Sequence, residues 1–455
     1  MAKAPSGFAA PFSSIRHLTN FPFSLTSSQT THFSTLRSTA AAASLLPESS
    51  TNPHPTLELI GGAAETFLPA LHTIHLPYLP YPLIAWNRHV ETIFAYPCWK
   101  PPASSPGIEC LRTSDGGPSL TGSGDDRHCS DLVSLLLNLN LNLNYIPCQF
   151  SHNLEYLIWS MMSLNIEHCR LQPGLTGGSG DTYVRHMLLR ARSKQWRVVV
   201  FNSRGCGDSP VTTAQFYSAS FLGDISEVVE HVGKRYPRSN LYAAGWSLGA
   251  NILVRYVGQE SFSCPLAGAI SLCNPFNLII ADEDFRKGFN IIYDKALSNS
   301  LCKIFKRHAL LFEDIGGEYN IPLAANAKSV REFDDGLTRV SFGFKSVNDY
   351  YSNSSSSDSI KNVSIPLLCI QAENDPIAPS RGIPREDIQK NPNCMLIVTP
   401  KGGHLGWVAG REAPFGAPWT DPIVMDFLEY LEKPSSSTDL LSSSNDANDL
   451  HQLEV

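Results

Sequence analysis

The sequence lacks several features that would point to particular classes of protein. None of its eleven cysteines belongs to a C-x-x-C pair, so neither a zinc site nor a disulfide framework is indicated, and we expect free thiols in a reducing compartment. The formal net charge is −7, which provides no basic field for nucleic acid. No run of apolar residues is both long enough and sufficiently free of polar and charged residues to cross a bilayer. With 455 residues, 42% of them hydrophobic, the chain can instead bury a substantial core.

The N-terminal region has no acidic residue before Glu48, while Ser, Thr and Ala are abundant there. This composition is typical of an organellar transit peptide, most like a chloroplast one, and we assign it to residues 1–50. A merely disordered N-terminus, with a cytoplasmic location, is the alternative. At the other end, residues 434–455 are rich in Ser, Asn and Asp, which predicts a flexible tail.

The stretch Gly245-Trp246-Ser247-Leu248-Gly249 lies between a predicted strand and a predicted helix. The apolar run 241–244 predicts the strand, and apolar residues recur at helical spacing over 248–257, with Gly258 as the expected stop. In that context Gly-x-Ser-x-Gly is the pattern of a nucleophile elbow, a sharp turn that exposes a serine hydroxyl above a parallel sheet. An ordinary glycine-rich turn is the alternative.

A serine nucleophile needs a base within hydrogen-bond reach and an acid that orients that base. Asp375 follows a predicted strand and precedes a proline, and His404 follows the next strand in a glycine-rich loop. The chain order Ser247, Asp375, His404 is the one expected of this kind of elbow. Glu373 is the alternative acid, with Asp375 then serving only as a turn residue.

A glycine-rich loop, 173–181, precedes another predicted helix. It lacks the Gly-Lys-Ser/Thr ending of a phosphate-binding loop and the spacing of a dinucleotide site, which argues against nucleotide binding. In a serine hydrolase such a loop presents backbone N–H groups to an oxyanion. We therefore expect the oxyanion to be held by the N–H of Leu248, directly after the nucleophile, and by that of Leu175 in this loop.

Predicted strands alternate with predicted helices from residue 173 onward, which indicates an α/β fold with a mostly parallel central sheet and helices on both faces. The expected strands are 197–201, 241–244, 266–272, 367–371 and 394–398, and a helix over 221–232 is expected to end at Gly233. We assign 173–433 to the catalytic core.

The alternation breaks at about 274–360, where one predicted helix carries apolar and basic residues on opposite faces. Its apolar face comprises Leu301, Ile304, Phe305, Leu311 and Phe312, and its basic face Lys303, Lys306 and Arg307. An insertion between two late strands is where a helical lid would lie, and a pair of packing helices is the alternative.

Residues 51–116 include an apolar, aromatic and proline-rich stretch that we expect to pack on the core as irregular structure and short helices. Within it, Asn87–Phe94 contains His89. A role for His89 in the site is one interpretation, but a hydrogen-bonded structural histidine is the better one.

The motifs together resemble a known family. Four motifs of this chain carry the resemblance: Gly174-Leu175-Thr176-Gly177-Gly178-Ser179, Asn202-Ser203-Arg204-Gly205-Cys206-Gly207, Gly245-Trp246-Ser247-Leu248-Gly249-Ala250-Asn251 and Asn374-Asp375-Pro376. These look like the plant embryogenesis-associated branch of the α/β-hydrolase superfamily, which is similar to bacterial short-chain carboxylesterases and to animal phospholipases and acylglycerol lipases of the α/β-hydrolase type. The resemblance covers roughly 87–117 and 173–431. It implies an α/β-hydrolase fold and ester hydrolysis with Ser247, Asp375 and His404 as charge-relay residues, without cofactor or metal.

The segment 117–172 departs from the family pattern. It includes an alternating Leu and Asn run at 135–144, and such low complexity rarely belongs to a packed enzyme core. Family members run an apolar strand straight into the Gly174 loop, whereas Glu167 and Arg170 precede it here, and unpaired charges are costly in a buried strand. Our hypothesis is that part of the segment is translated intron or a mis-joined exon. A transcript that encodes the segment as written would contradict it and would put the position of the oxyanion loop in question.

The sequence thus predicts a serine hydrolase that cleaves carboxylic esters, either acylglycerols or short- to medium-chain lipid esters, through an acyl-enzyme. An acyltransferase with the same acyl-enzyme and a non-catalytic ligand-binding protein are the alternatives. The expected partners are a small-molecule ester or lipid and, peripherally, a membrane. We expect no nucleic acid, protein partner, cofactor or metal.

Overall fold

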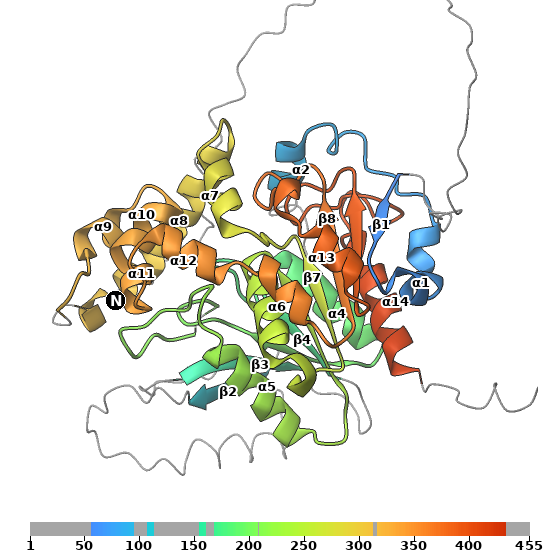
Figure 1. Cartoon of the computed structure of the whole chain (residues 1–455), viewed down its shortest axis with the longest axis horizontal. Coiled ribbons are helices and arrows are strands. Elements are labelled where there is room, and N and C mark those ends of the chain that lie inside the picture. The colour runs from blue at the N-terminus through green and yellow to red at the C-terminus, as the bar shows by residue number, and fades with distance from the viewer. Residues whose placement is uncertain are drawn as a thin grey trace, which may run out of the picture. The chain divides into compact units, whose positions relative to one another are not determined.

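The computed structural model describes residues 56–94, 107–112, 154–160, 168–207, 209–312 and 316–433. These residues form a nine-stranded sheet with helices on both faces and a helical insertion (Figure 1). The predicted transit peptide, the Leu and Asn run and the predicted tail lie outside the described residues.

The sheet is mostly parallel, as the sequence predicted. Its strands are β1 (Glu58–Ile60), β2 (Gly107–Arg112), β3 (Leu154–Ser160), β4 (His168–Gln172), β5 (Arg197–Phe201), β6 (Leu241–Trp246), β7 (Gly268–Leu272), β8 (Leu367–Ala372) and β9 (Cys394–Thr399). They lie in the order β1-β9-β8-β7-β6-β4-β5-β3-β2. All neighbours from β9 to β5 are parallel, whereas β1 at one edge and the strands β3 and β2 at the other pair antiparallel. The edge strand β1, which pairs with β9, was not predicted.

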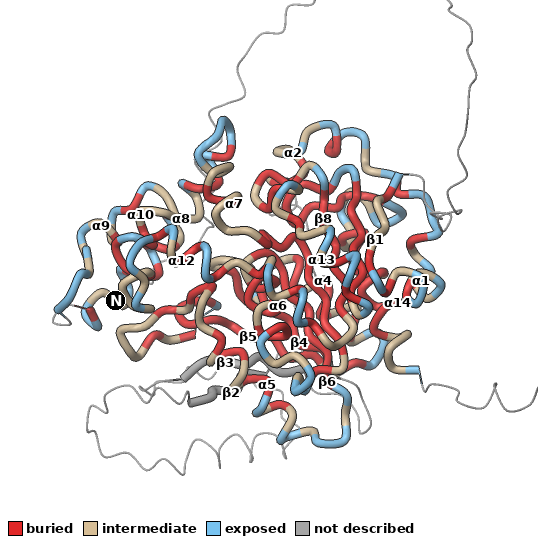
Figure 2. The backbone as a smooth tube through the Cα atoms, in the orientation of Figure 1, coloured by how far each residue is buried: buried red, intermediate tan, exposed pale blue. Residues whose placement is uncertain are grey.

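Two layers of helices cover the sheet because alternate residues of each strand face opposite sides. In β5, Val198 and Val200 belong to one apolar cluster, and Val199 and Phe201 belong to the other. The first cluster is covered by α1 (Ala64–Phe67), η3 (His72–His75), α4 (Thr182–Ser193) and α14 (Thr420–Glu432). The second is covered by α5 (Gly223–Arg235), α6 (Leu248–Glu260), η7 (Ser357–Asn362) and α13 (Arg385–Lys390). The buried residues are accordingly concentrated in the central strands (Figure 2).

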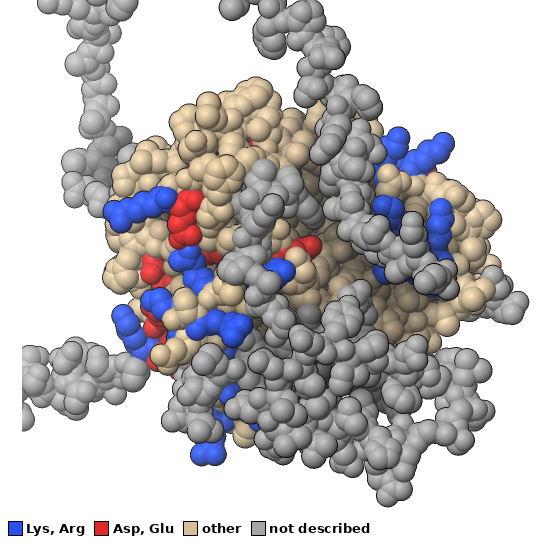
Figure 3. Space-filling model, turned by 180° about the vertical axis from the view of Figure 1, so that it is seen from behind, with Lys and Arg blue, Asp and Glu red and all other residues tan. Residues whose placement is uncertain are grey.

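The insertion between β7 and β8 is helical. Before η7 it contains α7 (Leu278–Phe285), α8 (Asn290–His308), η5 (Ala309–Phe312), α9 (Ile321–Asn326), α10 (Val330–Phe333), the π-helical turn η6 (Asp334–Thr338), α11 (Arg339–Ser341) and α12 (Val347–Ser354). The predicted amphipathic helix is confirmed, since α8 buries Leu301, Ile304 and Phe305 and exposes Lys303, Lys306 and Arg307. Seen from behind, Lys and Arg side chains lie in two groups, one on the right, where the insertion lies, and one on the left that also contains Asp and Glu (Figure 3).

Three sequence-based details were wrong. Helix α5 continues past Gly233 to Arg235, and α6 continues past Gly258 to Glu260. Gly258 serves packing rather than termination, because an added Cβ would lie 2.6 Å from the Ser359 carbonyl oxygen of η7. Leu311 is exposed because α8 ends at His308 and the tighter turn η5 changes the angular spacing of the side chains that follow.

The unexpected charge in the sheet is Arg170 of β4. This strand lies between β5 and β6, in register with Val199 and Ala243, so a central strand forms despite its polar sequence. Arg170 is 5% exposed, and its Nε and Nη1 atoms have no hydrogen-bond partner. Burial lowers the pKa of the guanidinium to about 9. The second charged residue that was singled out, Glu167, lies outside the described residues.

We predict that Arg170→Leu stabilises the protein. Replacing a buried, poorly paired charge with an apolar side chain of comparable volume removes a desolvation cost, for an expected gain of about 2–4 kcal/mol in the free energy of unfolding. Urea denaturation followed by circular dichroism measures the change. Arg170→Lys keeps the charge and is the control, expected to give no gain. A lower unfolding free energy for Arg170→Leu would contradict the prediction.

A buried carboxyl group in the insertion makes stability depend on pH. Asp334 accepts a hydrogen bond from the Tyr351 hydroxyl at 2.8 Å, and burial, helped by the nearby Asp282 and Asp294, raises its pKa to about 7. The folded state therefore holds this proton more tightly than the unfolded chain does. Its contribution to stability is greatest below about pH 4 and is lost as the pH rises through 7.

We predict that Asp334→Asn flattens this dependence. The wild-type protein should lose on the order of 4 kcal/mol more unfolding free energy than the variant between pH 4 and pH 8, because a shift of about three pKa units carries that free energy. Denaturant titrations of both proteins at several pH values give the difference. Parallel pH profiles for the two proteins would show that Asp334 does not titrate as described.

Candidate active site

The centre of the site is the turn between β6 and α6. Ser247 occupies it with φ +53° and ψ −123°, a backbone conformation that residues other than glycine rarely adopt. Its N–H donates to the Leu272 carbonyl of β7 at 2.9 Å. Gly249 must lack a side chain, because a Cβ there would lie 2.3 Å from the Pro173 carbonyl oxygen. The structure therefore shows the strand, strained turn and helix that the sequence predicted.

The three residues predicted to act together are brought together. His404 Nε2 lies 3.0 Å from Ser247 Oγ, and His404 Nδ1 lies 2.8 Å from one Asp375 carboxylate oxygen and 3.1 Å from the other. All three side chains are buried. This arrangement lets the imidazole accept the serine proton at Nε2 while Nδ1–H donates to the carboxylate.

The carboxylate is held in place by the turn after β8. Asp375 Oδ1 accepts hydrogen bonds from the N–H groups of Ile377 at 2.7 Å and Ala378 at 2.9 Å. The alternative acid, Glu373, is instead exposed and its carboxylate contacts Ser380 and, at 3.1 Å, Arg385. The geometry thus selects Asp375 over Glu373 as the partner of the histidine.

The glycine-rich loop after β4 lies directly against Ser247. A Cβ on Gly174 would be 3.1 Å from Ser247 Cβ. The loop is fixed from outside, since the N–H groups of Gly174 and Thr176 donate to the hydroxyls of Tyr183 at 3.0 Å and Tyr217 at 2.7 Å. The unusual strand has therefore not displaced this loop.

The two predicted oxyanion donors flank the serine. Leu175 lies in that loop, and Leu248 is the first residue of α6, so its N–H has no acceptor within the helix. The positive end of the helix dipole also lies there, which favours a developing negative charge. Their role as donors stays a prediction.

A comparison with known protein families shows which family this chain belongs to. A family model described as "alpha/beta hydrolase fold" matches residues 171–408, a range that includes the loop after β4, the elbow and the histidine. The chain belongs to the α/β-hydrolase family.

The chain is similar to several curated proteins, two of which have phospholipase or lipase names. The chain is 58% identical over 381 residues to "Embryogenesis-associated protein EMB8" of Picea glauca, covering 83% of this chain and 77% of the relative. It is 34% identical to "Phospholipase ABHD3" of Mus musculus over 241 residues, 53% of this chain and 58% of the relative. It is also 34% identical to "Monoacylglycerol lipase" of Saccharomyces cerevisiae over 247 residues, 52% and 54% of the two chains. The chain thus spans little more than half the length of the mouse and yeast relatives.

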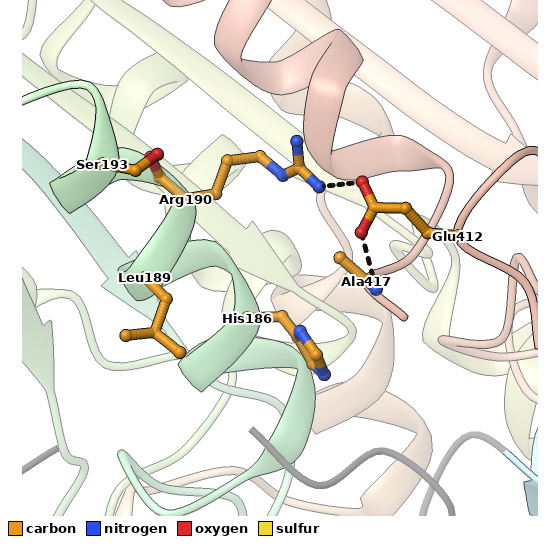
Figure 4. A pocket seen from close by; sticks show the side chains of 6 residues that line it. All are labelled: His186, Leu189, Arg190, Ser193, Glu412 and Ala417. Atoms are coloured by element: carbon orange, nitrogen blue, oxygen red, sulfur yellow. Dashed lines mark hydrogen bonds and ion pairs between the residues drawn. The ribbon is translucent and has the colours of Figure 1, made fainter. Parts of the chain in front are cut away.

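A separate surface pocket of about 300 Å³ contains none of the predicted catalytic residues of this α/β-hydrolase. Its lining residues are His186, Leu189, Arg190, Ser193, Glu412 and Ala417. Arg190 and Glu412 form an ion pair of 2.5 Å across it, and the Glu412 carboxylate also accepts the Ala417 N–H at 3.1 Å (Figure 4). The pocket therefore presents an internally paired set of charges.

Other classes of site receive no support from the described residues. Within those ranges, no group of three or more His, Cys, Asp or Glu side chains is arranged to hold a metal ion. In the same part of the chain, no helix combines the length and the apolar character needed to span a membrane.

Sequence reasoning missed the contribution of α2 (Arg88–Phe94) to the site. His89 is a hydrogen-bonded residue as expected, with its Nδ1 3.1 Å from the Tyr293 hydroxyl of α8. Glu91 and Thr92, which received no role, contact the backbone of the histidine loop at Gly402 and His404. The signal was confined to the polar pair Glu-Thr within a short helix of mixed polarity, and spacing alone could not link it to a loop 312 residues away.

We predict that Asp375→Asn lowers kcat for a p-nitrophenyl ester by about 10⁴-fold, because the amide cannot stabilise the imidazolium and can favour the wrong histidine tautomer. Glu373→Gln, two residues away, is the matched control and should stay within about threefold of wild type, since an exposed carboxylate away from the imidazole has little influence on it. Initial rates measured on the purified proteins give kcat for the wild type and for both variants. A larger loss for Glu373→Gln than for Asp375→Asn would reverse the assignment.

Proposed function

We propose that this α/β-hydrolase is a serine hydrolase that cleaves carboxylic esters, with acylglycerols or short- to medium-chain lipid esters as substrates. The observation that carries the proposal is the continuous chain of hydrogen bonds from Ser247 through His404 to Asp375 at the nucleophile elbow. The names of the mouse phospholipase and the yeast lipase support lipid-like esters as the substrate class.

In the proposed mechanism, Ser247 Oγ attacks the ester carbonyl carbon while His404 Nε2 takes its proton. Asp375 stabilises the imidazolium that forms, and the N–H groups of Leu248 and Leu175 hold the oxyanion. Collapse of the intermediate breaks the ester C–O bond, and the imidazolium protonates the departing alkoxide. Water, deprotonated by the same imidazole, then attacks the acyl-enzyme and releases the carboxylic acid and free serine.

In this mechanism the helical insertion is the proposed lid, and its contacts near the site support that role. Tyr293 and Phe289, at the start of α8, contact His89 of α2, and α2 in turn contacts the His404 loop. Burial raises the pKa of the Tyr293 hydroxyl to about 12, and the negative charge of Asp375 contributes to that shift. The insertion thus comes close to the acid of the proposed triad. The chloroplast location and a peripheral contact with a membrane stay predictions from the sequence.

The test is labelling with a fluorophosphonate probe, which reacts with an activated serine irrespective of the natural substrate. We expect one adduct, mapped by mass spectrometry to Ser247, and none in Ser247→Ala. Fatty acid release from monoacylglycerols and short-chain esters then defines the substrate, and addition of an alcohol separates hydrolysis from acyl transfer by the appearance of a new ester.

The same assay distinguishes the alternatives. A folded wild-type protein without an adduct would rule out the esterase and the acyltransferase together, and retained ligand binding would then indicate a non-catalytic role. Formation of a new ester as the main product would make the chain an acyltransferase that uses the same acyl-enzyme.

A further inference from the structure

The loop that carries His404 has a backbone that needs external support. Leu405 and Trp407 adopt positive φ values of +64° and +42°, and neither is a glycine. Each such residue costs on the order of 1 kcal/mol or more and persists only where the surroundings enforce it. The contacts around this loop therefore determine where the imidazole lies.

Three successive N–H groups of this loop donate to side chains from elsewhere in the chain. Gly402 N–H donates to Glu91 Oε2 at 3.0 Å, and His404 N–H donates to Thr92 Oγ1 at 2.9 Å. Between them, Gly403 N–H donates to Asn374 Oδ1 at 2.9 Å, one residue before Asp375. Two of the three acceptors thus come from α2, a helix outside the strand and helix alternation of the core.

The two α2 side chains are themselves fixed. Thr92 Oγ1 donates to the Arg88 carbonyl at 2.8 Å, which leaves its lone pairs free to accept the His404 N–H. Glu91 is fully buried and Thr92 is 5% exposed. Helix α2 also packs against the insertion, where the centroid of the His89 ring lies 4.4 Å from that of the Phe289 ring.

The packing between α2 and the loop leaves no room for side chains on the loop glycines. A Cβ on Gly403 would lie 2.6 Å from Thr92 Oγ1, and a Cβ on Gly406 would lie 2.8 Å from Glu91 Cγ. The loop backbone therefore lies in direct contact with both side chains, and the loss of either acceptor leaves a buried N–H without a partner.

From these contacts we infer that Glu91 and Thr92 are positioning residues for the proposed catalytic histidine. They hold the backbone of Gly402 and His404 so that the imidazole spans Ser247 and Asp375. The inference rests on the proposed function, and it assigns to the N-terminal extension a direct share in assembling the catalytic site.

The experiment compares rate constants for fluorophosphonate labelling of Ser247 in the full-length chain. Thr92→Val keeps the shape of the side chain but removes the acceptor for His404 N–H, and we expect a rate constant lower by about 10–100-fold, the scale of a misplacement of about 1 Å. Thr92→Ser retains the acceptor and should stay within about threefold of wild type. Thr338→Val, a buried threonine of the insertion, is the matched control for loss of a buried hydroxyl, with no change expected.

A second, independent pair of variants tests the role of Glu91. Glu91→Gln retains an oxygen acceptor for the Gly402 N–H and should label at close to the wild-type rate, whereas the apolar Glu91→Met should label about tenfold more slowly. Thr92→Ala removes the same acceptor as Thr92→Val with a smaller change in packing, and it replaces that variant if Thr92→Val does not fold. The rate constant comes from the time course, so an unfolded fraction lowers the final amount of adduct without changing the rate constant.

The outcomes separate this inference from the proposed function. If wild-type Ser247 forms no adduct, the proposed function fails and the positioning role fails with it. If wild-type Ser247 is labelled and both Thr92→Val and Glu91→Met label at wild-type rates, the positioning role is overturned while the proposed function stands. Slow labelling in these two variants, with wild-type rates in Thr92→Ser, Glu91→Gln and Thr338→Val, supports it.

Discussion

The strained backbone of Ser247 is the constraint on which the rest of the site depends. A positive φ at a serine directs its hydroxyl away from both strand and helix, and it persists only because β6 ends and α6 begins on either side of it. That turn requires Gly249 to lie against the end of β4, which brings the loop with Leu175 next to Ser247. One local conformation thus fixes the position of Ser247, of one proposed oxyanion donor and of the loop that carries the other.

The parallel sheet explains how residues far apart in sequence meet at this turn. Ser247, Asp375 and His404 each follow the carboxyl end of a strand, β6, β8 and β9, and those ends lie along one edge of the sheet. Short loops after these strands are then enough to bring the three side chains within hydrogen-bond distance. Helix α2 supplies from outside the sheet the acceptors that the strained histidine loop cannot provide for itself.

Strand β4 shows how far the sheet can enforce its own geometry. Backbone pairing with β5 and β6 on both sides keeps the strand in place, although Arg170 and Gln172 bury side-chain nitrogen and oxygen atoms without hydrogen-bond partners. These unpaired groups lower the free energy of unfolding, while the loop that follows still contacts Ser247. This mismatch is consistent with the hypothesis that part of 117–172 is not the natural continuation of the chain.

The sequence by itself determined the α/β pattern, the elbow and the chain order of Ser247, Asp375 and His404, because strand and helix periodicity and the Gly-x-Ser-x-Gly turn are local properties. Tertiary structure alone decided what depends on distant contacts. It selected Asp375 over Glu373 by orientation of the carboxylates, carried α6 past Gly258 because that glycine packs against η7, and brought Glu91 and Thr92 to the histidine loop. No spacing in the sequence encodes such contacts, since they arise only when separate elements pack together.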